Sequence, residues 1–191
     1  MGVVDVVVNV GGGLLAHAEH VDAALAAIGA AGRTRRLLVV PGGGPFADAV
    51  RDVDRRLGLS DDAAHWMAVL AMDQYAHFIA WRLAGGVLVT APADIEPALS
   101  QSTVPVLAPY RWLREADPLP HSWDVTSDSI AAWIAGQVGA EELVLVKPPG
   151  ASEGELVDAY FTRALPAQVK RTIVPADRIG ALDAALRGGS G

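Results

Sequence analysis

The sequence contains no cysteine, so disulfide bonds and thiolate chemistry are excluded. Charged residues are scarce, at 19% of the 191 residues, and their balance is acidic, with a formal net charge of −7. This balance argues against a nucleic-acid partner, because proteins that bind a phosphate backbone present a basic face. The hydrophobic fraction of 51% and the mean hydropathy of +0.30 indicate that some apolar surface is buried against another subunit.

Long uncharged apolar runs are also missing. The longest candidate for a membrane span, residues 63–84, is interrupted by polar and charged residues such as Asp73 and Arg82. The N-terminus lacks a basic region followed by an apolar core and a cleavage site, so no secretory signal is visible. We therefore expect a cytoplasmic protein without a membrane partner.

Six short apolar runs rich in β-branched residues have the length of buried strands. None alternates cleanly between apolar and polar residues, which is typical of parallel strands covered on both faces. They cover residues 3–10, 36–40, 86–90, 104–108, 142–146 and 171–174. Helical stretches lie between them and cover residues 14–31, 45–57, 61–84, 126–138, 153–165 and 176–186. This alternation predicts an α/β fold, a three-layer α/β/α sandwich with a mainly parallel central sheet.

The chain length and the alternation of elements predict a single domain over residues 1–187. We interpret residues 104–124, which are rich in proline and tryptophan, as a long irregular connection between two halves of this domain, 1–103 and 104–187. The terminal residues 188–191, Gly-Gly-Ser-Gly, are interpreted as a flexible tail or an added linker.

The predicted helix 61–84 is apolar on almost every side, so it must be buried on more than one face. Ser60 is a good N-cap for it, and Asp61 and Asp62 suit its positive amino end. A subunit interface is the simplest explanation of such a helix, and a wholly internal helix is the alternative.

Two glycine-rich turns follow predicted strands and precede predicted helices. The first glycine loop is Gly11, Gly12 and Gly13; the second glycine loop is Gly42, Gly43 and Gly44, followed by Pro45. Such turns direct bare backbone N–H groups at a helix start, where anions bind, and Pro45 fits a first helical turn. Each loop alone could be a tight turn without a ligand. Because the carboxyl ends of parallel strands share one sheet edge, the two loops together indicate an anion-binding site.

Three further features carry candidate chemistry. Thr126 or Ser127 could cap the helix that follows, with Asp128 in its first turn, although a plain helix start explains the same pattern. Lys147 lies just past a buried strand and is either a phosphate-neutralising group or an ordinary surface lysine. His17 and His20 share a helical face but lack an identifiable third ligand, so no metal ligands are assigned.

In this order the segments resemble the amino acid kinase superfamily. The resemblance rests on the first strand with its glycine loop, residues 40–47, the turn 126–129 and the strand before Lys147, which together span most of the chain. Residues 65–75 and 123–131 resemble in particular a branch of small kinases that act on aminomethylfuran phosphate in methanofuran-type, one-carbon cofactor synthesis. Members of the superfamily phosphorylate a carboxylate or phosphate with ATP and Mg²⁺, and many are oligomers.

The resemblance implies a role for each candidate residue. The first glycine loop, with Thr126 and Ser127, would bind the nucleotide and the transferring phosphates. The second glycine loop, with Pro45, would hold a small phosphate or carboxylate acceptor. Asp128 would organise the catalytic cations, and Lys147 would lie near the nucleotide phosphates. Residues 1–103 would then form the phosphate and acceptor half, and residues 104–187 the nucleotide half. The helix 61–84 would join copies of the chain or a kinase paralogue.

One departure from the superfamily pattern affects this interpretation. The superfamily has Lys-x-Gly-Gly-Ser at the first glycine loop, whereas this chain has Asn9 at the catalytic lysine position and Gly13 at the serine position. Loss of one such electrostatic contact commonly lowers a rate by roughly 10²–10³-fold. Three hypotheses follow: an ATP-dependent kinase, a degenerate kinase-fold protein that serves as a binding, regulatory or partner subunit, and an unrelated α/β binding protein.

Overall fold

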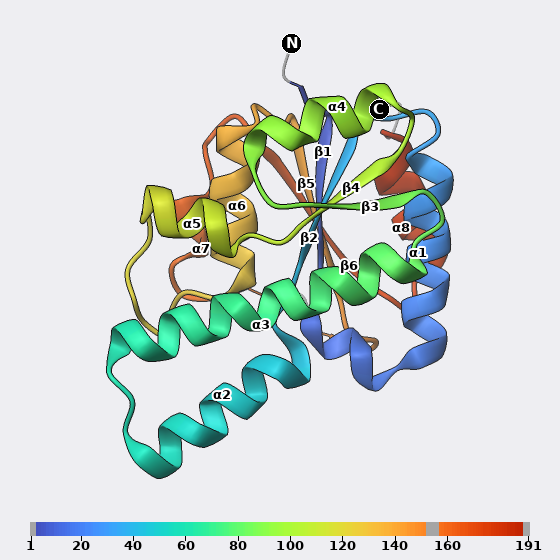
Figure 1. Cartoon of the computed structure of the whole chain (residues 1–191). Coiled ribbons are helices and arrows are strands. Elements are labelled where there is room, and N and C mark those ends of the chain that lie inside the picture. The colour runs from blue at the N-terminus through green and yellow to red at the C-terminus, as the bar shows by residue number, and fades with distance from the viewer. Residues whose placement is uncertain (1–2, 152–156, 189–191) are drawn as a thin grey trace.

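The computed structural model describes residues 3–151 and 157–188, in which a six-stranded parallel sheet carries helices on both faces (Figure 1). The strand order is β3-β4-β2-β1-β5-β6. The strands are β1 (Val6–Val10), β2 (Leu37–Pro41), β3 (Gly86–Val89), β4 (Val104–Leu107), β5 (Glu142–Lys147) and β6 (Lys170–Pro175). The predicted α/β/α sandwich is therefore confirmed, and each predicted strand is present with bounds shifted by at most a few residues.

Most predicted helices are also present. The helices are η1 (Gly12–Ala16), α1 (Ala18–Ala31), α2 (Gly44–Leu57), α3 (Asp61–Arg82), η2 (Pro92–Asp94), α4 (Ile95–Ser100), α5 (Tyr110–Ala116), α6 (Ser127–Gln137), α7 (Phe161–Ala164) and α8 (Ile179–Arg187). The predicted helix 14–31 is divided at His17, where the short 3₁₀ turn η1 gives way to α1. The predicted helix 153–165 is wrong in its described part, because only α7 forms there; residues 153–156 lie outside the described residues.

The interpretation of residues 104–124 as irregular is wrong for residues 110–116, which form α5, whereas residues 117–124 contain no helix or strand. This stretch begins with β4 and contains α5. The prolines that suggested irregularity bracket the helix instead: Pro109 is its N-cap, and Pro118 follows its left-handed end at Asp117. Buried Leu113 attaches α5 to the core, so tertiary packing stabilises a helix too short to form alone. The domain bounds and the tail proposed for residues 188–191 stay predictions, and residues 189–191 lie outside the described part.

Two apolar cores cover the two faces of the sheet. One joins the sheet to α1, α8 and the second half of α3; the other joins it to α4, α5, α6, α7 and the first half of α3. Helix α1, which follows β1, packs in the first core, and α6, which precedes β5, packs in the second. These two helices therefore lie on opposite faces of the sheet (Figure 1). The strand order thus reverses between β1 and β5. Open α/β sheets bind ligands at the carboxyl ends of such strands.

Helix α3 passes across the sheet and contributes to both cores, for example through Met72 and Ile79 (Figure 1). Burial on more than one face, predicted from its composition, is therefore confirmed. The alternative of a wholly internal helix is wrong, because Leu70 and Trp81 are 41% and 75% exposed. A subunit interface on α3 stays a prediction. No helix in the described ranges 3–151 and 157–188 is long and apolar enough to cross a membrane.

Candidate active site

The two glycine loops meet at the carboxyl edge of the sheet. The backbone N–H of Gly11 donates to Val146 O at 2.9 Å, and that of Gly42 donates to Val10 O at 2.8 Å, so each loop is attached to a neighbouring strand. A Cβ added to Gly12 would lie 2.0 Å from the backbone nitrogen of Gly44, which itself has a positive φ of 54°. Glycine at these two positions permits the backbone contact between the loops.

A cavity of about 330 Å³ opens where the loops meet. Its lining includes, from the sequence-predicted site, Gly11, Gly12, Gly13, Gly43, Gly44, Thr126, Ser127, Asp128 and Lys147. Gly42 lies instead against Gly12, where a Cβ would come within 2.3 Å of the Gly12 nitrogen. Pro45 occupies the first turn of α2, as predicted, and is not among the described lining residues. Segments far apart in the sequence thus converge on one cavity.

Thr126 caps α6, and Asp128 lies in its first turn, as the sequence indicated. Lys147 Nζ, from the end of β5, donates to both carboxylate oxygens of Asp128 at 2.7 and 2.6 Å. The two side chains are only 13% and 7% exposed. Burial raises the pKa of the Asp128 carboxyl, and the Lys147 ammonium opposes this shift. The result is a buried ion pair on the cavity wall, next to the first glycine loop.

Asn9 is fully buried and is not among the described lining residues. Its Nδ2 lies 3.3 Å from Val40 O and 3.5 Å from Ser127 O, so the amide joins β2 to the start of α6. This geometry gives Asn9 a supporting position beside the cavity, and its catalytic assignment stays a prediction.

The arginines that follow α1 do not replace the missing lysine. Arg35 donates to Leu186 O and Glu142, and Arg36 donates to Val3 O and pairs with Glu96. Both precede β2 and therefore lie at the amino edge of the sheet, opposite the glycine loops.

Asp158 supports the site and was missed by the sequence analysis. Its Oδ2 accepts hydrogen bonds from Thr126 N at 2.8 Å, Thr126 Oγ1 at 2.7 Å and Ser129 N at 3.1 Å, and its Oδ1 accepts from Ser129 Oγ and from Tyr160 N. The carboxylate thereby fixes the first turn of α6, which carries Asp128. Its position outside any recognisable motif, within a predicted helix, gave no signal.

Replacing Asp158 with Asn is expected to lower the free energy of unfolding by about 2–4 kcal/mol, because an amide NH₂ would face hydrogen-bond donors in place of a carboxylate oxygen. Urea unfolding followed by circular dichroism measures this change. Asp177→Asn, at an exposed position, is the control and should leave stability nearly unchanged. Equal stability of the two variants would show that Asp158 does not fix α6.

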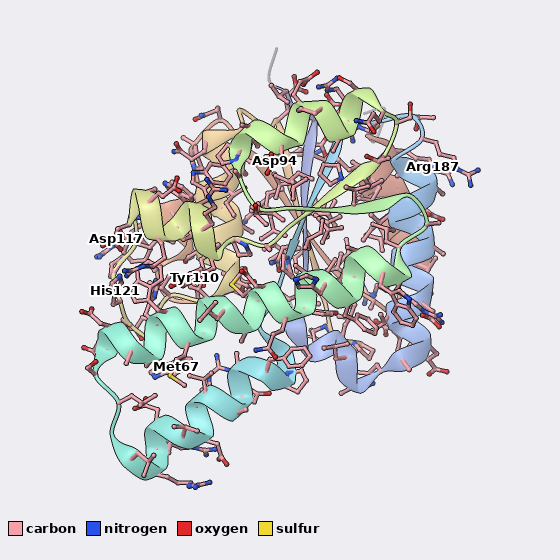
Figure 2. All side chains as sticks on the ribbon, in the orientation of Figure 1. Met67, Asp94, Tyr110, Asp117, His121 and Arg187 are labelled. Atoms are coloured by element: carbon pink, nitrogen blue, oxygen red, sulfur yellow. The ribbon has the colours of Figure 1, made fainter. Side chains whose placement is uncertain are left out.

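A histidine stack lies beside the start of α3 (Figure 2). His121 bonds to Asp62 at 2.5 Å and to Asp117 at 2.9 Å, and its ring stacks on that of His65 with centroids 4.2 Å apart. Burial, and then the neighbouring His121, lower the pKa of His65 to about 4. His65 lines the cavity, and its lowered pKa makes the imidazole neutral near pH 7. The stack attaches the segment before Trp123 to α3.

The described residues contain no group of three or more side chains suited to a metal ion. Mg²⁺ usually takes only one or two protein carboxylates besides substrate phosphates, so the Mg²⁺ that the resemblance implies stays a prediction. Asp128 lies on the cavity wall with the first glycine loop and would hold such an ion; Asp48 and Asp61 line the same cavity.

A parallel sheet with two glycine loops in contact beside a buried lysine–aspartate pair is the arrangement expected of an α/β protein that binds phosphate. The chain belongs to the amino acid kinase family, whose profile matches residues 6–148, so the resemblance noted in the sequence is confirmed. It is 27% identical over 139 residues to the [5-(aminomethyl)furan-3-yl]methyl phosphate kinase of Methanocaldococcus jannaschii. That match covers 73% of this chain and 63% of the relative.

Solved structures show the same fold. Uridylate kinase from Archaeoglobus fulgidus superposes with a TM-score of 0.71 at 15% identity, covering 96% of both chains. UMP kinase from Ureaplasma parvum gives a TM-score of 0.71 at 14% identity, covering 96% of this chain and 95% of that one. At these identities the likeness concerns architecture alone.

Proposed function

We propose that this protein transfers the γ-phosphoryl group of ATP to a small phosphorylated or carboxylated acceptor, in methanofuran-type one-carbon cofactor synthesis. The observation that carries the proposal is the Lys147–Asp128 pair beside the first glycine loop. Because β1 and β5 are paired, with Val10 opposite Val146, Lys147 supplies a cation next to the loop whose own lysine position is Asn9.

The proposed reaction requires few protein groups besides these. An ionised carboxylate or phosphate oxygen of the acceptor attacks the γ-phosphorus, and the bond from that phosphorus to the β–γ bridging oxygen breaks, releasing ADP. Such an acceptor is already deprotonated at neutral pH, so no general base is needed. The protein's task is to position both substrates and neutralise charge. Lys147 and the N–H groups of the two glycine loops do this; Mg²⁺ held by the nucleotide and Asp128 would offset the phosphate charge.

The relative from M. jannaschii supports the acceptor class, because its name specifies a phosphate ester as substrate. The match is only 27% identical over 139 residues, so the acceptor requires a direct test.

The test is ADP release from Mg²⁺–ATP in the presence of candidate acceptors, beginning with [5-(aminomethyl)furan-3-yl]methyl phosphate. Acceptor-dependent ADP release, and its loss when EDTA removes Mg²⁺, are the expected results. Absence of ADP release with every furan phosphate and carboxylate tried would contradict the proposal. Nucleotide binding without turnover would then favour the degenerate alternative, a binding, regulatory or partner subunit.

A further inference from the structure

Helix α3 has an outer face without charged side chains. Between Asp62 and Arg82 its exposed residues follow one another at spacings of three and four: Met67, Leu70, Gln74, His77 and Trp81. Residues with these spacings share one face of a helix, so they form a continuous stripe about 21 Å long, which we call the α3 stripe. It contains no Asp, Glu, Lys or Arg. Figure 1 shows α3 on the outside of the molecule, in front of the sheet.

The composition of the α3 stripe differs from that of a solvated helix surface. On α2 the outer face carries Arg–Asp pairs, such as Arg51 with Asp48. In the α3 stripe, by contrast, Trp81 is 75% exposed. Three of the six large hydrophobic side chains exposed within residues 3–151 and 157–188 belong to the stripe, and two more, Leu57 and Val87, flank α3 in the chain. Apolar side chains gathered in this way mark a surface that another macromolecule covers.

The α3 stripe faces away from the cavity. Helix α3 lines the cavity with residues that include Ala64, Ala68 and Met72. At about 3.6 residues per turn, these lie on the side of the helix opposite Leu70 and Gln74. A partner that covers the stripe therefore leaves the cavity open to its ligands.

The α3 stripe is complementary to itself. Gln74 is its midpoint, seven residues from both Met67 and Trp81. When two copies of α3 lie antiparallel with a twofold axis at Gln74, Met67 of one copy meets Trp81 of the other, a favourable contact between sulfur and an aromatic ring. The two Gln74 side chains meet on the axis, where each carboxamide both donates and accepts a hydrogen bond. A polar amide at the centre of an apolar seam fixes the register of paired helices.

The ends of α3 favour this antiparallel orientation. Asp61 and Asp62 lie in its first turn, and Arg82 lies in its last. With the axis at Gln74, Arg82 of each helix lies about 6 Å along the helix from the level of Asp62 of its partner, so unlike charges approach at both ends of the seam. A parallel pair would bring like charges and like ends of the helix dipoles together. Spacings of three and four are also those of helices that cross at about 20°.

We propose that the α3 stripe is the interface of a homodimer, in which two α3 helices pack antiparallel across a twofold axis at Gln74. The partner is a second copy of this chain, because a stripe that matches its own reversed copy supplies the self-complementary contact of a twofold dimer. This interface goes beyond the proposed kinase function and does not depend on it.

The test is sedimentation equilibrium of the purified full chain over a range of concentrations. Wild type is expected at twice the chain mass of 19.9 kDa. Gln74→Glu places two carboxylates on the axis and should weaken self-association by about 100-fold, and Gln74→Lys should do the same with two ammonium groups. An equimolar mixture of these two variants should restore the dimer, because opposite charges then meet on the axis. Gln168→Glu, the same change at an exposed turn outside α3, is the matched control and should associate like wild type.

The proposal is overturned if wild type stays monomeric at every concentration, or if Gln74→Glu associates as strongly as wild type. It is also overturned if the mixture of the two Gln74 variants associates no better than either variant alone. Gln74 is exposed, and both replacements favour a helix, so the variants should fold; circular dichroism checks this. Trp81→Gln is a second variant, which removes the apolar partner of Met67 and should weaken the dimer by about 10-fold or more. None of these measurements uses ATP, so failure of the dimer and failure of the kinase function are distinguished.

Discussion

Replacing Lys147 with Met is expected to lower kcat for ATP-dependent transfer by about 10²–10³-fold, the usual cost of losing one contact that stabilises developing charge. Lys147 is the cation next to the first glycine loop, and Met keeps its length without its charge. The loss should fall mainly on kcat, because the charge to be stabilised is greatest in the transition state. Steady-state ADP release at saturating substrates measures it.

The sequence offers a matched control, because Lys147 and Lys170 are its only two lysines. Lys170 is exposed at the start of β6, and Lys170→Met should leave kcat unchanged. Removing Lys147 also leaves Asp128 buried without its partner, so unfolding must be measured for each variant. Adding Asn9→Lys to the Lys147→Met protein should recover part of the lost rate, because both positions flank the same loop. Unchanged kcat in Lys147→Met would contradict the proposed role.

Replacing Gly12 with Ala is expected to damage both the site and the fold. The new Cβ would lie 2.0 Å from Gly44 N and 2.4 Å from Gly44 Cα, so backbone must move. Overpacking of this kind costs about 1–3 kcal/mol or more. A displacement of about 1 Å between substrates can lower a rate by about 10²-fold. Thermal unfolding and kcat/KM for the acceptor measure the two effects.

Gly180→Ala serves as the control, because a Cβ there meets nothing within 4 Å and alanine favours the helix in which it lies. It should leave activity unchanged and stability equal or slightly higher. Wild-type kcat/KM in Gly12→Ala would mean that the two glycine loops need not touch for the protein to work.

Much of the fold followed from local patterns. The strands were recognisable because parallel strands buried on both faces form continuous apolar runs. The glycine loops were recognisable because glycines between a strand and a helix expose backbone N–H groups that suit an anion. The short helices α4 and α5 were not recognisable, since packing of residues such as Ile95 and Leu113 stabilises them. In the site, Thr126 could be predicted as a cap from its neighbours in sequence. Asp158, which binds that cap from 32 residues away, could not.

The acceptor side was harder to predict from sequence. Asp48 and Arg51 reach the cavity on α2, and Trp123 reaches it from the segment before α6, where its Nε1 donates to Asp54 of α2; no spacing in the chain marks them as neighbours. The burial that makes His65 neutral is likewise not marked by any spacing. Conversely, the substitution at Asn9 was visible at once, but the proximity of Lys147 on a neighbouring strand needed the sheet register.

The contact between Gly12 and Gly44 has a thermodynamic consequence. Because the first and second glycine loops share a backbone contact with no side chain between them, neither can shift without moving the other, and under the proposed function they hold ATP and the acceptor. Occupancy of one loop therefore changes the set of conformations open to its neighbour. Linkage makes that influence reciprocal: whatever factor ATP applies to the acceptor's affinity, the acceptor applies to that of ATP. The total free energy of binding both substrates is the same for either order of binding, and the order decides only how much of it appears in each step.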